Sequence, residues 1–227
     1  MRAAVLLAWS ALSFAALPAA PARSESVDLA LVLAVDASGS VDQYRFGLQK
    51  RGYAAAFRSS RVIKAISSGA AQAIAVTLVQ WTGPALQEQA IGWTVVRGAA
   101  AAEDFAAAIE RMPRRLFGGG TSISGAIDYS RLLLARLPFT AARRVIDVSG
   151  DGANNRGRSV TLARDAAVRD GIGINGLPIL ALEPDLDRYY FDHVVGGPGA
   201  FMIPAQSYDT FADAVLKKLV MEIAANE

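Results

Sequence analysis

The sequence contains no cysteine and one histidine in 227 residues. Without cysteine the chain can form no disulfide, so oxidation contributes nothing to its stability. Thiolates and imidazoles are also the usual ligands of zinc and copper, so a zinc site is not expected. A serine or cysteine triad needs a histidine base, and we expect His193, in a late segment, to be a surface histidine or one with its hydrogen bonds satisfied rather than a ligand.

A charge excess of one sign is also missing. The chain has 23 Lys and Arg against 21 Asp and Glu, a formal net charge of +2. Such a balance gives no long-range attraction to nucleic acid or to an acidic membrane. With 52% hydrophobic and 19% charged residues the chain is too apolar to be disordered. Its length allows a core that needs no metal to fold, so a bound metal would serve function.

The first residues have the order of a secretory signal peptide. Met1 and Arg2 precede the apolar stretch 3–17, and the small residues Pro18-Ala19-Ala20-Pro21-Ala22 follow. As a helix, the stretch would span about 22 Å, less than the roughly 30 Å of a membrane's hydrocarbon core. We predict a signal peptide at residues 1–22, cleaved after Ala22 or Ala20, and no transmembrane segment in the mature chain. The periplasm is then the most natural location, with secretion as the alternative.

The rest of the chain alternates between strand and helix patterns. Strands are predicted at 29–35, 73–81, 90–96, 144–149, 172–180 and 201–204. Helices are predicted at 41–57, 100–112, 122–134, 159–170 and 186–193, and in a last segment with Phe211, Val215, Leu219 and Ile223 at four-residue steps. The short Gly83-Pro84 turn predicts a hairpin and hence one antiparallel edge strand. We therefore predict, for residues 23–227, a single doubly wound α/β domain with a mostly parallel sheet and helices on both faces.

Oxygen-bearing side chains follow several of these strands. Asp36, Ser38 and Ser40 come after the first strand, Thr121 follows three glycines, and Asp151 comes after strand 144–149. In open α/β sheets ligands bind at the carboxyl ends of the strands, so these loops should converge. Carboxylate and hydroxyl oxygens suit Mg²⁺ or Mn²⁺, and two carboxylates balance a divalent charge.

The order Asp36-x-Ser38-x-Ser40, then Thr121, then Asp151-Gly152 resembles the metal-ion-dependent adhesion site of von Willebrand factor type A domains. The resemblance extends over the whole mature chain, including the edge hairpin. It implies Ser38 and Ser40 as direct ligands, Thr121 as a ligand that depends on state, and Asp36 and Asp151 as ligands directly or through water.

The same resemblance implies a protein partner that offers Asp or Glu to the sixth position of the metal. The segments GGTSISGAID, VIDVSGDGANN and GGPGAF are also similar to an uncharacterised bacterial family of exported type A domain proteins. The sequence departs from the pattern of type A domains at Gly150, before Asp151-Gly152, where a residue with a hydroxyl group is expected at the end of the strand. The leading interpretation is a non-enzymatic, metal-dependent protein-binding domain.

Several of these residues also have a simpler structural interpretation. Ser40-Val41-Asp42-Gln43 fits a helix capping box, which does not exclude metal binding by Ser40. Asp147 interrupts an apolar strand, and we favour a structural pairing with an arginine such as Arg143 over a role behind the metal. Asn154 and Asn155 either rim the ligand face or only form a turn. Phe46, Tyr53 and Phe57 are expected in the core.

Two other functions remain open. A phosphatase of the haloacid dehalogenase type also places an aspartate after its first strand, here Asp36, beside Mg²⁺. Its usual second aspartate, two residues on, is replaced by Ser38. A structural scaffold without bound metal is the third hypothesis. Phosphate-binding glycine motifs and a GxSxG serine elbow do not occur in the sequence.

Overall fold

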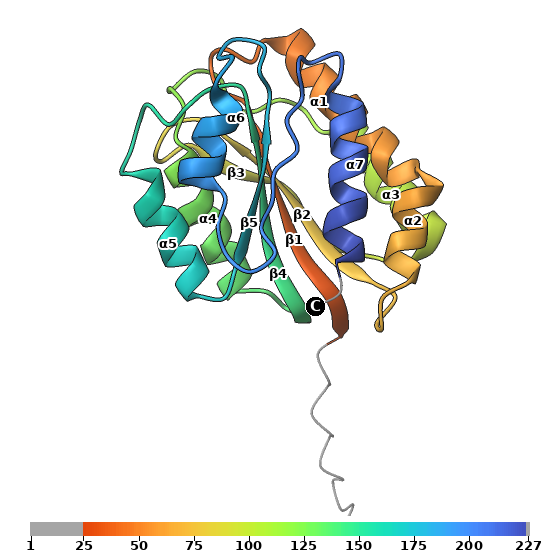
Figure 1. Ribbon diagram of the computed structural model, residues 1–227. Coiled ribbons are helices and arrows are strands. Elements are labelled where there is room, and N and C mark those ends of the chain that lie inside the picture. The colour runs from red at the N-terminus through yellow and green to blue at the C-terminus, as the bar shows by residue number, and fades with distance from the viewer. Residues whose placement is uncertain (1–24, 226–227) are drawn as a thin grey trace, which may run out of the picture.

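Within residues 25–225, which the computed structural model describes, five strands form one sheet in the order β3-β2-β1-β4-β5 (Figure 1). Pairing is parallel except between β2 and β3, so the predicted fold class and its antiparallel edge strand are confirmed. The strands are β1 (Ser26–Asp36), β2 (Ile74–Trp81), β3 (Gln87–Val96), β4 (Thr140–Gly150) and β5 (Gly173–Pro178).

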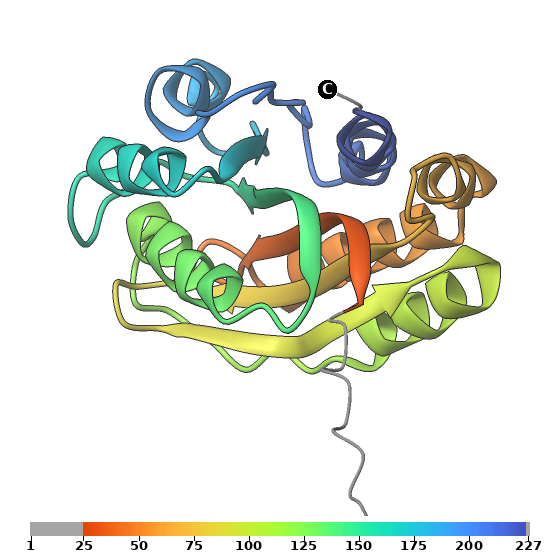
Figure 2. The same cartoon turned by 90° about the horizontal axis from the view of Figure 1, so that it is seen from below.

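Helices cover both faces of the sheet (Figure 2). One face carries α1 (Gln43–Arg58), α2 (Ser60–Ser67), α3 (Gly98–Arg111) and α7 (Phe211–Ala224). The other carries α4 (Ile123–Ala135), α5 (Val160–Arg169) and α6 (Leu186–Tyr189) with the π-helical turn η1 (Tyr190–Val194). None of the helices in the described part of the chain is long and apolar enough to cross a membrane.

The central strand β1 explains why the core has two halves. Its alternate side chains enter opposite clusters: Leu31 and Leu33 pack toward α1 and α7, and Val32 and Ala34 toward α4. A strand buried on both faces needs an unbroken apolar run, which is the pattern of its sequence. The aromatic residues Phe46, Tyr53 and Phe57 of α1 are buried in the first half, as predicted.

The structure differs from the predicted elements in three places. Helix α2 follows α1 directly and was not predicted. The segment 201–204 is no regular strand but touches β5 through one isolated bridge, between Met202 and Gly176, and Pro204 has no N–H to extend a ladder. The helix predicted at 186–193 is divided into α6 and η1. The predicted signal peptide, residues 1–22, lies outside the described residues.

The strand register brings the predicted site loops to one edge of the sheet. Asp36, the last residue of β1, lies beside Trp81 at the end of β2, and Val35 lies beside Ser149 near the end of β4. The loops after β1 and β4 therefore start next to each other.

Candidate cation site

Asp36 is fully buried at the end of β1. Its Oδ1 accepts a hydrogen bond of 2.7 Å from the backbone N–H of Ser38, which bends the loop sharply. Its Oδ2 has no hydrogen-bond partner among residues 25–225. Burial and, second, the charge of Asp151 raise the pKa of Asp36 to about 7, against the opposing hydrogen bond from Ser38. A buried carboxylate oxygen without a donor is costly unless a cation or a proton neutralises it.

The two serines connect this loop to Asp151. The hydroxyl oxygens of Ser38 and Ser40 lie 3.1 Å apart, and Ser40 donates a hydrogen bond of 2.6 Å to Asp151 Oδ1. The other oxygen, Oδ2, accepts a hydrogen bond of 2.8 Å from the Tyr208 hydroxyl and lies 3.8 Å from Arg45 Nη1. Asp151 is therefore oriented by groups from three separate segments.

Thr121 reaches the same place from the loop before α4. Its backbone N–H donates to Asn155 Oδ1 at 2.9 Å, and its carbonyl accepts from the backbone N–H groups of Asn155 and Arg156. Gly118, Gly119 and Gly120 before it all have positive φ, which explains the run of glycines. A Cβ added at Gly152, next to Asp151, would lie 3.7 Å from Thr121 Oγ1, so the two loops are in contact.

Four of the predicted ligands line one cavity, and the fifth lies behind it. The cavity has a volume of about 240 Å³. Its walls are formed by residues of the loops after β1, before α4, after β4 and after β5: Ser38, Gly39, Ser40, Gly120, Thr121, Asp151, Gly152, Asn155, Leu182 and Glu183. Asp36 holds the Ser38 backbone just beneath it.

Gly150 has a packing role that the sequence did not reveal. A Cβ at this position would lie 3.0 Å from Asp36 Oδ2, 3.1 Å from the Trp81 ring and 3.1 Å from the Tyr190 hydroxyl. The Tyr190 hydroxyl, like Asp36 Oδ2, is buried without a hydrogen-bond partner in the described part of the chain. The glycine that departs from the usual motif thus makes room for the Asp36 carboxyl group.

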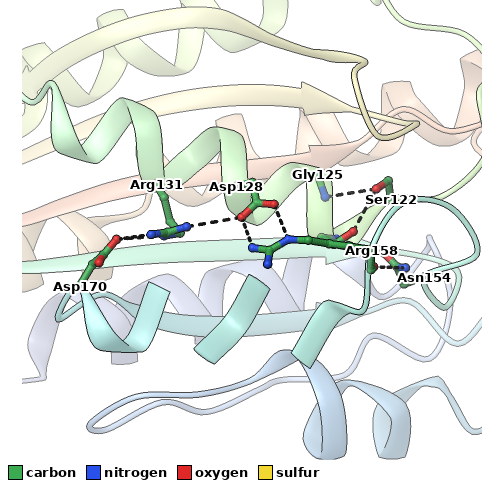
Figure 3. A network of polar contacts seen from close by, with 8 residues as sticks. Ser122, Gly125, Asp128, Arg131, Asn154, Arg158 and Asp170 are labelled. Atoms are coloured by element: carbon green, nitrogen blue, oxygen red, sulfur yellow. Dashed lines mark hydrogen bonds and ion pairs between the residues drawn. The ribbon is translucent and has the colours of Figure 1, made fainter. Parts of the chain in front are cut away.

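The loops that carry the site are fastened on the α4 side by a polar network (Figure 3). Asn154 Oδ1 accepts a hydrogen bond of 3.0 Å from Ser124 N–H in the first turn of α4. Arg158 contacts Asp128 at 2.6 Å, and Arg131 contacts Asp170 at 2.6 Å, so α4 is joined to both ends of α5. Asn155 lines the cavity, whereas Asn154 holds the loop.

Two structural interpretations from the sequence need correction. The N-cap of α1 is Asp42, which accepts from Arg45 N–H at 2.7 Å, because the helix begins later than a Ser40 cap requires and Ser40 turns to Asp151. Asp147 does have a structural ion-pair partner, but it is Lys218, at 2.6 Å. His193 is exposed, with its ring beside Tyr189.

Sequence reasoning missed Tyr208, Arg45, Leu182 and Glu183 at the site. Tyr208, Leu182 and Glu183 meet the site only through the tertiary fold, so no local motif marks them. Arg45 lies five residues after Ser40 and donates to its carbonyl oxygen at 2.7 Å, but a single arginine in a helix is not a motif. For the buried Lys218 a signal existed: Lys218 and Glu222 are one turn apart beside the apolar stripe of α7, and both are buried.

The donor set fits a hard divalent cation. Within residues 25–225 no group of three His, Cys, Asp or Glu side chains is placed to hold a metal. The gathered side chains are instead two carboxylates and three hydroxyls, all oxygen ligands of the kind that Mg²⁺ and Mn²⁺ accept. The unpartnered Asp36 Oδ2 provides the buried negative charge that such an ion would neutralise.

Known structures of the same fold come from several organisms. A von Willebrand factor type A protein from Catenulispora acidiphila is 16% identical with a TM-score of 0.59, over 88% of this chain and 44% of that one. The type V pili tip protein Mfa5 of Porphyromonas gingivalis has a vWF domain that is 10% identical with a TM-score of 0.58, over 88% and 98% of the chains.

A third structure is proximal thread matrix protein 1 from the mussel byssus, with its MIDAS motif occupied by zinc. It is 15% identical with a TM-score of 0.58, over 87% of this chain and 46% of that one. The chain thus spans less than half the length of the mussel and Catenulispora proteins. A comparison with curated proteins finds no match.

The protein has the fold of a von Willebrand factor type A domain, with carboxylates and hydroxyls at the carboxyl edge of its sheet. It belongs to the family described as "Protein of unknown function (DUF1194)", whose profile matches residues 26–227.

Proposed function

We propose that this protein is a non-enzymatic, divalent-cation-dependent protein-binding domain of the adhesion type. Asp36, Ser38, Ser40, Thr121 and Asp151 hold Mg²⁺ or Mn²⁺, and a protein partner supplies an Asp or Glu to the cation. The observation that carries the proposal is the fully buried Asp36 Oδ2, which has no partner among residues 25–225 and belongs to the residue beneath a cavity lined by hydroxyls and Asp151.

Each predicted ligand has a distinct part in this proposal. The Asp36 and Asp151 carboxylates balance the charge of a divalent cation, and the Ser38, Ser40 and Thr121 hydroxyls supply neutral oxygens. A bound ion of this kind keeps a coordination position for an external oxygen when the protein fills fewer than six. The zinc-occupied MIDAS of the mussel protein supports metal binding, and the pilus tip protein supports an adhesion role.

The absence of catalysis is proposed from the chemistry of the side chains around Asp36. A phosphatase with Asp36 as nucleophile needs a second acid two residues on, and that position holds Ser38. The protein should therefore release no phosphate from p-nitrophenyl phosphate with Mg²⁺ present. Hydrolysis that Asp36→Asn abolishes would favour the phosphatase instead.

We propose further that the protein is exported after cleavage of residues 1–22. The charged start, the apolar stretch and the small residues before Ala22 support a signal peptide. Expression in a bacterial host followed by N-terminal sequencing of the periplasmic and secreted fractions tests this. A chain that stays in the cytoplasm and begins at Met1 would contradict it.

Calorimetric titration with MgCl₂ and with MnCl₂ tests the cation site. Wild type should bind about one ion, and Asp36→Asn and Asp151→Asn should each abolish binding because the carboxylate charge is lost without a change in volume. The exposed Asp209→Asn serves as control and should bind as wild type does. Equal affinity in all four proteins would refute the proposed site.

Affinity capture tests the partner. The immobilised protein is incubated with a native periplasmic extract in Mg²⁺ and eluted with a chelator. We expect one or more proteins to be eluted from wild type but not from the Asp36→Asn column. The same set of proteins from both columns, or with and without Mg²⁺, would contradict binding through a metal.

A further inference from the structure

A third carboxylate, Glu183, lines the wall of the candidate cation site. It lies in the loop between β5 and α6, far in sequence from the predicted ligands, and shares the cavity of about 240 Å³ with Asp151 and Thr121. The motif that suggested the site does not include it, so its place there comes from the fold alone.

One oxygen of Glu183 accepts a hydrogen bond, and the other accepts none from the residues that the structure describes, 25–225. Oε2 accepts a hydrogen bond of 3.1 Å from Ala153 N–H, in the loop that carries Asp151. Oε1 faces the gap at Gly152, where an added Cβ would lie 3.3 Å from it and 3.7 Å from Thr121 Oγ1. The carboxylate is thus held beside the loop after β4, with Oε1 near Gly152 and Thr121.

Glu183 and Thr121 both border the space left by the missing side chain of Gly152. A Cβ there would contact both Glu183 Oε1 and Thr121 Oγ1. A carboxylate oxygen at this position would be attracted to a divalent cation in the cavity, because anionic oxygens are the preferred ligands of such ions.

Asp36, Asp151 and Glu183 are not gathered closely enough to hold an ion together in the structure of residues 25–225. We propose that the exposed Glu183 side chain turns toward a cation held by Asp36 and Asp151, so that its Oε1 takes the coordination position that would otherwise be open to a partner's acid. The inference rests on the proposed function, since it needs a cation held by Asp36 and Asp151. A partner's Asp or Glu then binds by displacing an acid of this chain, which lowers the apparent affinity for weak acidic ligands and favours a partner with additional contacts.

The test uses Mn²⁺ alone, with its free concentration followed by electron paramagnetic resonance and its bound water by proton relaxation. Glu183→Ala should bind Mn²⁺ about tenfold more weakly than wild type and carry about one more fast-exchanging water per bound ion. Glu183→Gln, which keeps an acceptor for Ala153 N–H, should also bind more weakly. Asp185→Ala, an exposed acid two residues away in the same loop, is the matched control and should equal wild type.

Sodium acetate then serves as the probe for a partner's acid. It should displace bound water from the Glu183→Ala complex at about tenfold lower concentration than from wild type, because no internal acid competes. Equal hydration, Mn²⁺ affinity and acetate response in wild type and Glu183→Ala would overturn this inference and leave the proposed cation site standing. Failure of wild type and all variants to bind Mn²⁺ would overturn the proposed function, and this inference with it.

Discussion

Replacing Lys218 by methionine should destabilise the protein strongly. The Lys218 ammonium group lies 2.6 Å from Asp147 of β4 and 2.6 Å from Glu222 of α7, and the side chains of all three residues are at most 1% exposed. Asn175 donates a further hydrogen bond of 2.7 Å to Glu222. Methionine fills a similar volume but leaves two buried carboxylates without their cation.

The expected cost follows from the energetics of buried ion pairs. Removing one partner of such a pair typically costs about 3–5 kcal/mol, because the remaining charge stays buried and unpaired. That is a large fraction of the roughly 5–15 kcal/mol by which domains are stable. Lys217→Met, on the exposed side of the same helix, should change the stability by no more than about 0.5 kcal/mol.

Urea unfolding followed by tryptophan fluorescence measures both variants, and pH adds a second check. Burial and, second, the charge of Glu222 raise the pKa of Asp147, against the attraction of Lys218. A raised pKa means that the folded state keeps a proton that the unfolded state releases, so stability falls as the pH rises from about 4 toward 7. Loss of Lys218 strengthens this effect.

The deficit of Lys218→Met relative to wild type should therefore be larger at pH 8 than at pH 5. The triple variant Lys218→Met, Asp147→Asn, Glu222→Gln, with all three charges removed, should recover much of the loss. A cost below about 1 kcal/mol for Lys218→Met at pH 8, or no difference from Lys217→Met, would refute the reasoning from buried charge.

Three further predictions concern the candidate site and its surroundings. Gly150→Ala should lower the free energy of unfolding in urea by about 1–3 kcal/mol and weaken Mn²⁺ binding, because the added methyl group crowds Asp36. Gly92→Ala, with open space at its Cβ, is the control, and an equal loss of stability in both variants would contradict this. Mg²⁺ affinity measured by calorimetry should fall by about tenfold for each pH unit below the Asp36 pKa of about 7, since cation binding requires the ionised carboxylate. An Mg²⁺ affinity that stays constant between about pH 5.5 and 8.5 would exclude Asp36 as a ligand. Asp42→Ala should lower stability by about 1 kcal/mol without changing cation affinity, whereas Ser40→Ala should weaken cation binding; the reverse result would make Ser40 the helix cap.

The fold was largely predictable because its elements have strong local signals. The apolar run of β1, the helical spacing of Phe46, Tyr53 and Phe57, and the short turn before β3 each indicate one structure only. Helix α2 was missed because it follows α1 after a single residue, Ser59, with no turn sequence to separate the two.

The gathering of the predicted side chains could be anticipated for a topological reason. Parallel strands end at one edge, so residues placed after β1 and β4 must meet there. That argument gives the neighbourhood of Asp36 and Asp151 but not the orientation of their carboxyl groups. Orientation depends on Tyr208 and Gly150, whose contacts arise from segments distant in sequence and have no local pattern.

The polar alternation in β4 shows how a pattern can suggest the wrong environment. Asp147, Ser149 and Asp151 alternate with apolar residues, as in a strand with one face in water. Yet β4 lies between β1 and β5 with helices on both faces, and all three residues are buried. Alternation in such a strand indicates a buried polar network facing α1 and α7.

Asp147, Ser149 and Asp151 have different partners, and the partners distinguish structural residues from candidate ligands. Asp147 has Lys218, and the Ser149 hydroxyl accepts from the Tyr53 hydroxyl at 3.2 Å inside the core. Only Asp151, beyond the end of the strand, borders a cavity as well as its hydrogen-bond partners. Among these three side chains, Asp151 is therefore the one that an external cation can reach without opening the core.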